Sequence, residues 1–248
     1  EKYGVSVSTI QRHLHSILST RIISKDKEVV VLMDATYWGH NFGVLVFKDA
    51  KRGKILWRKF LDRKEVLADY LEGVEWLEQH CFHIKGVVCD GLRGLPQALS
   101  RYKVQYCQFH QVKTVCAYLT RNPKTAAGIE LRGLAKMLCH TDKESFVGAL
   151  DEWYEQWGNF IKERSKEEKT GRMTYTHRRL RSAYFSLKHN MPWLWTWYDY
   201  SEIGIPNTNN GIEAMNTDLK TKLRVHNGLS KRHRMLFIDE YFRQHFNR

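Results

Sequence analysis

The chain lacks any run of 18 apolar residues, and its N-terminus lacks the order of basic, apolar and small residues that marks a secretory signal. We therefore expect neither a membrane-spanning helix nor secretion. Internal repeats are absent, and 42% of the 248 residues are hydrophobic, which is enough to bury a core. The five cysteines are odd in number, which predicts reduced thiols in an ordered cytoplasmic protein.

Acidic residues are scarce relative to basic ones. The sequence holds 27 Asp and Glu against 40 Lys and Arg, so its formal charge is +13. Such an excess favours a polyanionic partner, most simply nucleic acid. The alternative is a protein that is basic only for solubility.

The first 24 residues contain YGVSVSTIQRHLHSI, which resembles the second half of a helix-turn-helix. Ile10, Leu14 and Ile17 would form the buried stripe, so Gln11 and Arg12 would face outward to contact DNA. The alternative is a plain amphipathic helix that continues an upstream domain. Because the chain begins with Glu inside this motif, we expect an N-terminal part of the natural protein to be missing.

Residues 25–121 alternate between strand-like and helix-like patterns. Three apolar runs form an expected antiparallel meander: VVVLMDA, FGVLVFKD and KILWRKFL. Helical spacing follows over 64–80, then the strand IKGVVCDG, a short helix near 92–100, the strand VQYCQF and a helix from His110. This order matches the ribonuclease H-like fold, an α/β fold with a mixed five-stranded sheet flanked by helices. Its first and fourth strands are parallel neighbours, so Asp34 and Asp90, each expected at a strand end, would lie together at one edge.

The pattern becomes helical over 122–206, which predicts an all-α insertion into the sheet domain. Thr141 and Glu144 form an expected capping box, and Phe146, Leu150 and Trp153 follow along one helix face. SKEEKTG reads as a polar connection. Residues 207–248 then return to the ribonuclease H-like core.

The stretch TNNGIEAMN, residues 208–216, places Glu213 in the first turn of an expected helix. This acid could simply stabilise the helix N-terminus, or it could bind a metal ion. Ile212, Met215, Leu219 and Leu223 would pack, while a polar face would carry Glu213, Asn216, Lys220 and Arg224. Beside Asp34 and Asp90, Glu213 would complete a cluster of three carboxylates, which two Mg²⁺ or Mn²⁺ ions would neutralise. Such a site catalyses phosphodiester hydrolysis or transesterification.

The succession of MDATYWG, CDGLRGL, CQFHQVK, a helical insertion and TNNGIEAMN resembles a DDE transposase of the bacterial mutator-like type, over residues 28–225. The resemblance implies that Asp34, Asp90 and Glu213 bind the catalytic metals. It also implies an auxiliary role near the active site for His110 of the C-x-x-H motif, Cys107 to His110. From the residues alone, this pair could be half of a zinc site, or a buried thiol with a helix-capping or supporting histidine.

A transposase would cut DNA at the inverted-repeat ends of a transposon and join the freed 3′-hydroxyl to target DNA. It would work as a homodimer or higher assembly in association with the nucleoid. Basic groups at 177–181, including Arg178 and Arg179, and at 229–234 would contact phosphates with Lys220 and Arg224. Among Trp193, Trp195 and Trp197, at least one is expected to be exposed, and related transposases use such an aromatic to stack on a flipped base.

Two other readings remain. The first is another metal-dependent nuclease of the same fold, such as a resolvase or an RNA-cleaving hydrolase, because the fold does not determine the substrate. The second is a non-catalytic DNA-binding regulator derived from a transposase. The presence of all three acids weighs against this second reading.

Overall fold

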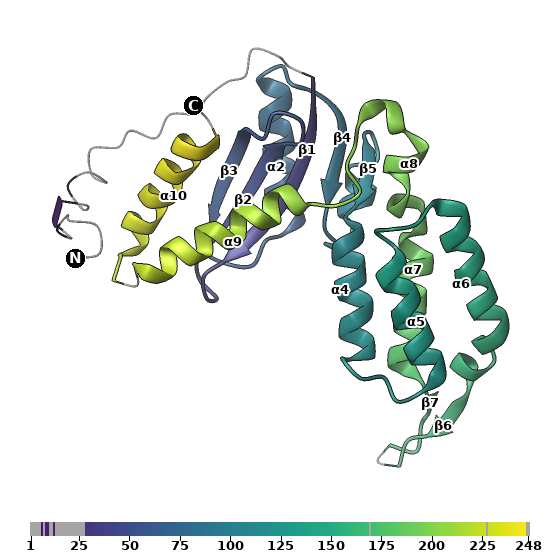
Figure 1. Ribbon diagram of the computed structural model, residues 1–248. Helices are drawn as coiled ribbons and strands as arrows, with labels where there is room; N and C mark the ends of the chain where they lie inside the picture. Colours follow the sequence, from purple (N-terminus) through teal and green to yellow (C-terminus); the bar gives the residue numbers. More distant parts are fainter. Residues whose placement is uncertain are drawn as a thin grey trace. The chain divides into compact units, whose positions relative to one another are not determined.

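The computed structural model describes residues 28–168, 170–226 and 228–246, together with Ser6, Ser8, Thr9 and Arg12. The chain is α/β, with the mixed five-stranded sheet order β3-β2-β1-β4-β5 (Figure 1). Its strands are β1 (Glu28–Tyr37), β2 (Gly43–Asp49), β3 (Ile55–Leu61), β4 (His83–Cys89) and β5 (Lys103–Tyr106). The predicted sequence of strands and helices and the antiparallel β1-β2-β3 meander are confirmed.

One expectation about the first strand is wrong. Asp34 does not end β1, because Ala35, Thr36 and Tyr37 continue the ladder opposite Leu45, Val44 and Gly43. The strand extends because β2 returns after a short loop, in which the Trp38 N–H donates to the Phe42 carbonyl at 2.8 Å. Asp34 therefore lies inside the sheet, opposite Val46.

The chain divides into two compact units. The first contains residues up to 87, residues 92–102 and residues from 209 onward. Besides most of the sheet, it holds the helices α2 (Leu67–Gln79), α3 (Leu95–Ala98), α9 (Asn210–Val225) and α10 (Lys231–Phe246). The second unit contains residues 88–91 and 103–208.

Helices cover both faces of the sheet in the first unit. A Cβ added to Gly73 of α2 would lie 2.7 Å from the Phe47 ring, so α2 packs on the face to which Phe47 points. Successive strand residues point to opposite faces, and Lys48 reaches α9 through the Gly211 carbonyl at 2.9 Å. Hence α9 lies on the face opposite α2, and Figure 1 shows it crossing the strands there.

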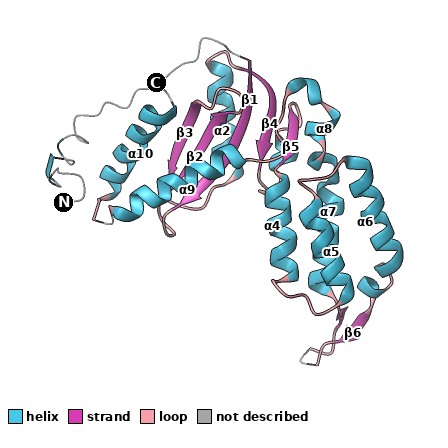
Figure 2. Cartoon of the chain, in the orientation of Figure 1, coloured by secondary structure: helices cyan, strands magenta, loops and turns pink. Residues whose placement is uncertain are grey.

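The second unit is mainly helical (Figure 2). Its elements are α4 (Gln108–Leu119), α5 (Ala126–Met137), α6 (Lys143–Trp157), η1 (Phe160–Lys162), β6 (Arg164–Lys166), β7 (Met173–Tyr175), α7 (Arg178–Leu194), α8 (Thr196–Asp199) and η2 (Ser201–Ile203). One apolar cluster includes Val115 of α4, Leu131 of α5, Phe146 of α6 and Leu187 of α7. The region predicted as an insertion thus shares its core with α4, which the sequence assigned to the sheet domain.

Two local expectations in this unit are wrong. The stretch expected as a polar connection belongs to a β6-β7 hairpin, in which Arg164 pairs with Tyr175 and Lys166 with Met173. The N-cap of α6 is Asp142, whose carboxylate accepts a hydrogen bond from the Ser145 N–H at 2.8 Å, so Thr141 and Glu144 form no capping box. None of the helices in the described residues is both long and apolar enough to cross a bilayer.

Candidate functional site

Asp34 is the best-defined of the predicted acids. It lies on β1 and is only 8% exposed, so its carboxylate needs a partner that offsets the loss of water. The Asn216 side-chain amide of α9 donates a hydrogen bond to Asp34 Oδ2 at 2.8 Å, and Asn216 is itself buried. An amide donor favours the ionised form of a carboxylate.

Three contacts fix the first turn of α9 against the strands. The Asn209 side chain donates to the Met33 carbonyl at 2.9 Å, directly before Asp34. Lys48 Nζ donates to the Gly211 carbonyl at 2.9 Å, and burial lowers the pKa of this lysine. A Cβ added to Gly211 would lie 3.6 Å from the Leu32 side chain, which is ordinary contact distance. Asn209 and Gly211, both before Glu213, therefore dock the helix on the sheet.

Glu213 lies in the first turn of α9, as predicted, and is half-buried. Residues three apart share a helix face, so Glu213 lies one turn before Asn216, the residue that touches Asp34. The predicted stripe of Ile212, Met215, Leu219 and Leu223 is buried, and Lys220 and Arg224 are exposed. Within the first unit, α9 therefore carries Glu213 on the side of the helix that meets Asp34.

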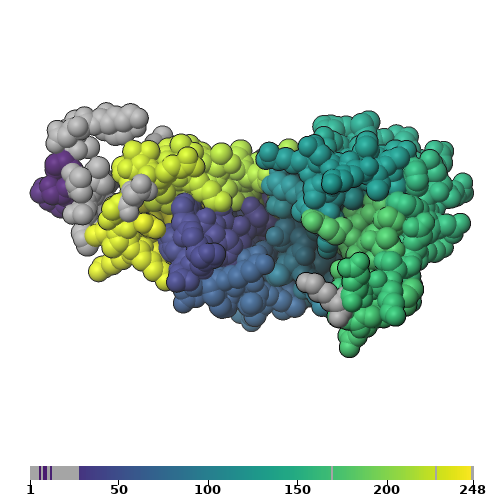
Figure 3. Space-filling view, turned by 90° about the horizontal axis from the view of Figure 1, so that it is seen from below, coloured from purple at the N-terminus to yellow at the C-terminus, as the bar shows by residue number. Residues whose placement is uncertain are grey.

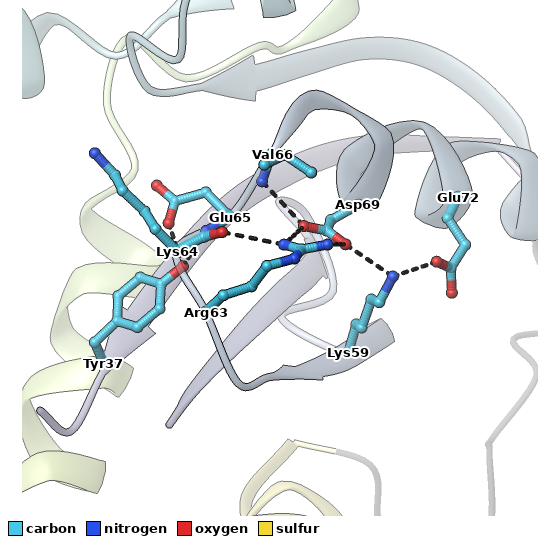
Figure 4. Close-up of polar contacts among 8 residues, drawn as sticks. All are labelled: Tyr37, Lys59, Arg63, Lys64, Glu65, Val66, Asp69 and Glu72. Atoms are coloured by element: carbon cyan, nitrogen blue, oxygen red, sulfur yellow. Dashed lines mark hydrogen bonds and ion pairs between the residues drawn. The ribbon is translucent and has the colours of Figure 1, made fainter. Parts of the chain in front are cut away.

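The end of β1 is held by a network of polar contacts (Figure 4). Tyr37, three residues after Asp34, donates its hydroxyl to the Glu65 carboxylate and accepts the Glu65 N–H at 2.7 Å. Burial, together with the hydrogen bond to Glu65, raises the pKa of the Tyr37 hydroxyl, which keeps it protonated as a donor. This contact fixes β1 against the loop that enters α2.

Asp69 is the centre of the same network (Figure 4). It is 1% exposed and forms ion pairs with Lys59 at 2.8 Å and Arg63 at 2.7 Å. Burial opposes ionisation, yet the hydrogen bonds from Arg63 and Lys59 hold the pKa of Asp69 well below its usual range. Asp69 also accepts the Val66 N–H at 3.0 Å, which satisfies a free amide at the start of α2.

Asp90 directly follows β4 and is half-buried in the second unit. Its neighbour Gly91 lies against Tyr106, because an added Cβ would come within 1.8 Å of the tyrosine hydroxyl oxygen. Burial, and next the charge of Asp90, raises the pKa of Tyr106 and of the Cys89 thiol. Asp90 therefore lies close to a tyrosine and a thiol that both stay protonated.

The C-x-x-H motif lies at the start of α4. Cys107 is fully buried, and its N–H donates to the Cys89 carbonyl at 2.8 Å. His110 is half-buried in the first turn of the helix. All five cysteines are thiols, as predicted.

The predicted site residues divide between the two compact units. Asp34 and Glu213 belong to the first unit, and Asp90, Cys107 and His110 belong to the second. No group of three or more His, Cys, Asp or Glu side chains placed to hold a metal ion occurs in the described part of the chain.

The predicted DNA contacts are scattered over the chain. Arg12, Arg178, Arg179, Lys220 and Arg224 are exposed, whereas Gln11 and most of the predicted helix-turn-helix lie outside the described residues. Arg179 also donates to the Ala117 carbonyl at 2.7 Å.

The tryptophan expectation is not met. Trp195 is fully buried, and Trp193 and Trp197 are half-buried, packed against the core of the second unit. The Trp195 ring packs at a tilted angle against Phe146, with ring centroids 5.8 Å apart. The predicted core position of Trp153 is confirmed.

Sequence reasoning missed the roles of two residues. Asn216 was placed on the polar face of its helix but not against Asp34, and its position three residues after Glu213 was the available signal. Lys48 was read as part of a strand. A lysine that directly follows the apolar run GVLVF indicates a buried partner, and here the partner is the start of α9.

No family model matches the chain, and no curated protein matches it.

Proposed function

We propose that the chain is the catalytic region of a DDE transposase with a ribonuclease H-like core. It would cleave DNA at transposon ends and transfer the freed 3′-hydroxyl to target DNA. The order of strands and helices supports this fold, as does the sheet order, in which β1 and β4 are neighbours. Asp34 lies on β1 and Asp90 directly follows β4.

One observation carries the proposal: the hydrogen bond of 2.8 Å between Asn216 and Asp34. It joins α9, which carries Glu213, to β1, which carries Asp34. Two further hydrogen bonds, from Asn209 to the Met33 carbonyl and from Lys48 to the Gly211 carbonyl, hold the start of the same helix on the strands. The bond therefore favours the metal-ligand reading of Glu213.

The residues fit divalent metal ions of the hard type. Asp34, Asp90 and Glu213 offer carboxylate oxygens, which Mg²⁺ and Mn²⁺ prefer, and the carboxylate of buried Asp34 accepts a hydrogen bond from the Asn216 amide. When bound, two such ions would stabilise the attacking and leaving oxygens of an in-line displacement at phosphorus. Asp34, Asp90 and Glu213 are the residues that would hold these ions. The proposal requires Asp90 to reach the same ions as the two acids of the first unit.

Other residues would support this reaction. Asn216 would hold the Asp34 carboxylate in place, and His110 would assist near the scissile phosphate. Exposed Arg178, Arg179, Lys220 and Arg224 would bind the DNA backbone. Pairing of two transposon ends would require a dimer or a higher assembly, and the enzyme would associate with the nucleoid.

The test is cleavage and strand transfer with Mg²⁺ or Mn²⁺ on labelled DNA that carries the native element's ends. Glu213→Gln is expected to reduce both rates about 1,000-fold or more, because divalent ions supply several kcal/mol of transition-state stabilisation. DNA binding should persist. Glu202→Gln, a change at an exposed glutamate outside the site, is the matched control and should cut normally.

Three outcomes would overturn the proposal. If Glu213→Gln cuts as well as the wild type, Glu213 is only a helix-stabilising acid. Metal-dependent cleavage of RNA or of branched DNA without strand transfer would indicate another nuclease of this fold. DNA binding without metal-dependent cleavage would indicate a regulator.

A further inference from the structure

A pocket of about 310 Å³ opens in the first unit, along the part of α9 that follows Asn216. Its lining residues are Trp38, Gly39, Lys220, Leu223, Arg224 and Arg234. They come from the loop after β1, from α9 and from α10. In Figure 3 the surface of α9 and α10 borders that of the first strands. The volume is at the lower end of the range for small-ligand sites, roughly 300–1,000 Å³.

The charge of the pocket has one sign. Lys220, Arg224 and Arg234 line it, and none of the described residues that line it is acidic. Lys220 and Arg224 are four residues apart on one helix, an arrangement in which like charges repel. Arg234 is directed by a hydrogen bond from its Nε to the Leu229 carbonyl at 3.0 Å. An anion in the pocket would offset this repulsion and accept hydrogen bonds from the guanidinium groups.

Trp38 also contributes a hydrogen-bond donor. Its indole Nε1 is buried and has no hydrogen-bond partner in the described structure, and an indole nitrogen can only donate. A buried donor without an acceptor is destabilising, so an oxygen atom of a ligand would relieve it. Gly39 next to it has φ +75° and open space where a Cβ would stand, so no side chain closes the entrance there.

We propose that this pocket binds one phosphate group of a nucleic-acid strand. Lys220, Arg224 and Arg234 would surround the phosphate, and the Trp38 indole would donate to one of its oxygens. The phosphate follows from the charges and donors of the pocket, and its source in nucleic acid rests on the proposed function. Because Lys220 is one turn after Asn216, the phosphate would neighbour the one that is cut.

The test is the salt dependence of binding to a labelled DNA duplex, measured without divalent metal so that no cleavage is required. Each phosphate contact contributes about 0.9 to the slope of log K against log salt concentration. The triple variant Lys220→Gln, Arg224→Gln, Arg234→Gln should lower the slope by about one in total, because the three cations share one phosphate. A slope lowered by about three would mean that the three side chains contact three separate phosphates. An unchanged slope would mean that they contact none. Either result would contradict the proposal that the pocket binds one phosphate.

Two single variants sharpen the result. Trp38→Phe keeps a ring but removes the N–H, so it should weaken binding about fivefold without changing the slope. Lys51→Gln removes an exposed charge of the same unit outside the pocket and should change neither quantity. If Trp38→Phe binds DNA as tightly as the wild type does, the indole N–H of Trp38 does not contact the phosphate.

A calorimetric titration with inorganic phosphate distinguishes the source of the group. Weak or absent binding together with the loss of one unit of slope supports a nucleic-acid phosphate. Tight binding that the triple variant abolishes, with an unchanged DNA slope, would mean a free phosphate ligand and would overturn the assignment to nucleic acid. These measurements need no catalysis. If the triple variant lowers the salt-dependence slope by about one while the wild type shows no cleavage activity, the proposed function is contradicted and the phosphate pocket is not.

Discussion

At the scale of single residues, Asn216 shows why an amide and not an acid faces Asp34. The amide nitrogen donates at 2.8 Å to a carboxylate that is 8% exposed. A second carboxylate at that position would repel the first, and one of the two would have to stay protonated. The residue three positions after Glu213 is therefore a hydrogen-bond donor to the acid on β1.

Asn216→Asp should lower the free energy of unfolding by about 3 kcal/mol at neutral pH. The folded pair would hold a proton that the unfolded chain releases, so the pKa of the pair is raised by folding. Stability relative to the wild type should then recover as the pH falls toward about 4. Denaturant unfolding at several pH values measures this effect. Asn216→Ala, which removes only the hydrogen bond, should show a smaller loss without this recovery, and equal stability of Asn216→Asp and wild type at neutral pH would contradict the account.

Gly91 is required by the tyrosine beside it. Gly91→Ala would bring Cβ within 1.8 Å of the Tyr106 hydroxyl oxygen, and Tyr106 is buried. The expected loss is about 1–3 kcal/mol, measured by denaturant unfolding. In a Tyr106→Phe background the loss should shrink but not vanish, because the ring carbon Cζ remains at 2.7 Å. An equal loss in both backgrounds would show that the hydroxyl is not the obstacle.

At the scale of elements, the start of α2 depends on the buried Asp69. Its lowered pKa means that Asp69 stabilises the fold above its ordinary pKa of 3.8, and this contribution is lost as the pH falls below that value. Asp69→Asn should lower the free energy of unfolding by about 2 kcal/mol at pH 7. The variant should also lose less stability than the wild type as the pH is lowered below about 3.8. Glu72→Gln is the control, since its carboxylate is 56% exposed and should matter by less than about 0.5 kcal/mol. The same acid dependence in Asp69→Asn and wild type would assign it to another group.

The cap of α6 distinguishes two neighbouring residues. Asp142 accepts the Ser145 N–H at 2.8 Å, and the Ser145 hydroxyl donates back at 2.9 Å. These bonds also lower the pKa of Asp142. Asp142→Ala should lower the melting temperature by about 2–4 °C, and Thr141→Ala should leave it nearly unchanged. If Thr141→Ala lowered the melting temperature more than Asp142→Ala did, the result would support the capping box of Thr141 and Glu144 that the sequence suggested.

Patterns in the sequence predicted the elements of the first unit better than their ends. Apolar runs identified β1, β2, β3 and β4, because these strands contain consecutive buried residues, and helical spacing identified α2 and α9, because each helix buries one face. The end of β1 was missed because the apolar run stops at Asp34, whereas Thr36 and Tyr37, both residue types that favour strands, continue the pairing with β2. The α6 cap was missed because Thr141 and Asp142 are both good N-cap residues, and the sequence alone does not show after which of them the helix begins.

At the scale of the whole molecule, the division into two units was not visible in the sequence. Residues 122–206 read as an insertion because their pattern is helical, yet α4 and β5 belong to the same compact unit. The reason is tertiary: Tyr106, Val115 and Leu119 are buried in the core formed by α5, α6 and α7. Local periodicity shows that a helix has an apolar face but not which neighbour covers it.

The candidate site was predictable in part for the same reason. Acids next to apolar strands, and a glutamate in an asparagine-rich turn, are local signals. The amide that holds Asp34 comes from 182 residues further along the chain, and no local pattern shows that pairing.

The most direct test of the account is Mn²⁺ binding by the isolated protein, followed by calorimetry or electron paramagnetic resonance. The wild type is expected to bind two ions, and Asp34→Asn, Glu213→Gln and above all Asp90→Asn should each abolish or strongly weaken the binding of at least one. Asp90 is decisive because it belongs to a different compact unit from the other two acids. If Asp90→Asn binds Mn²⁺ as the wild type does, the three acids do not form one metal site and the central claim is wrong.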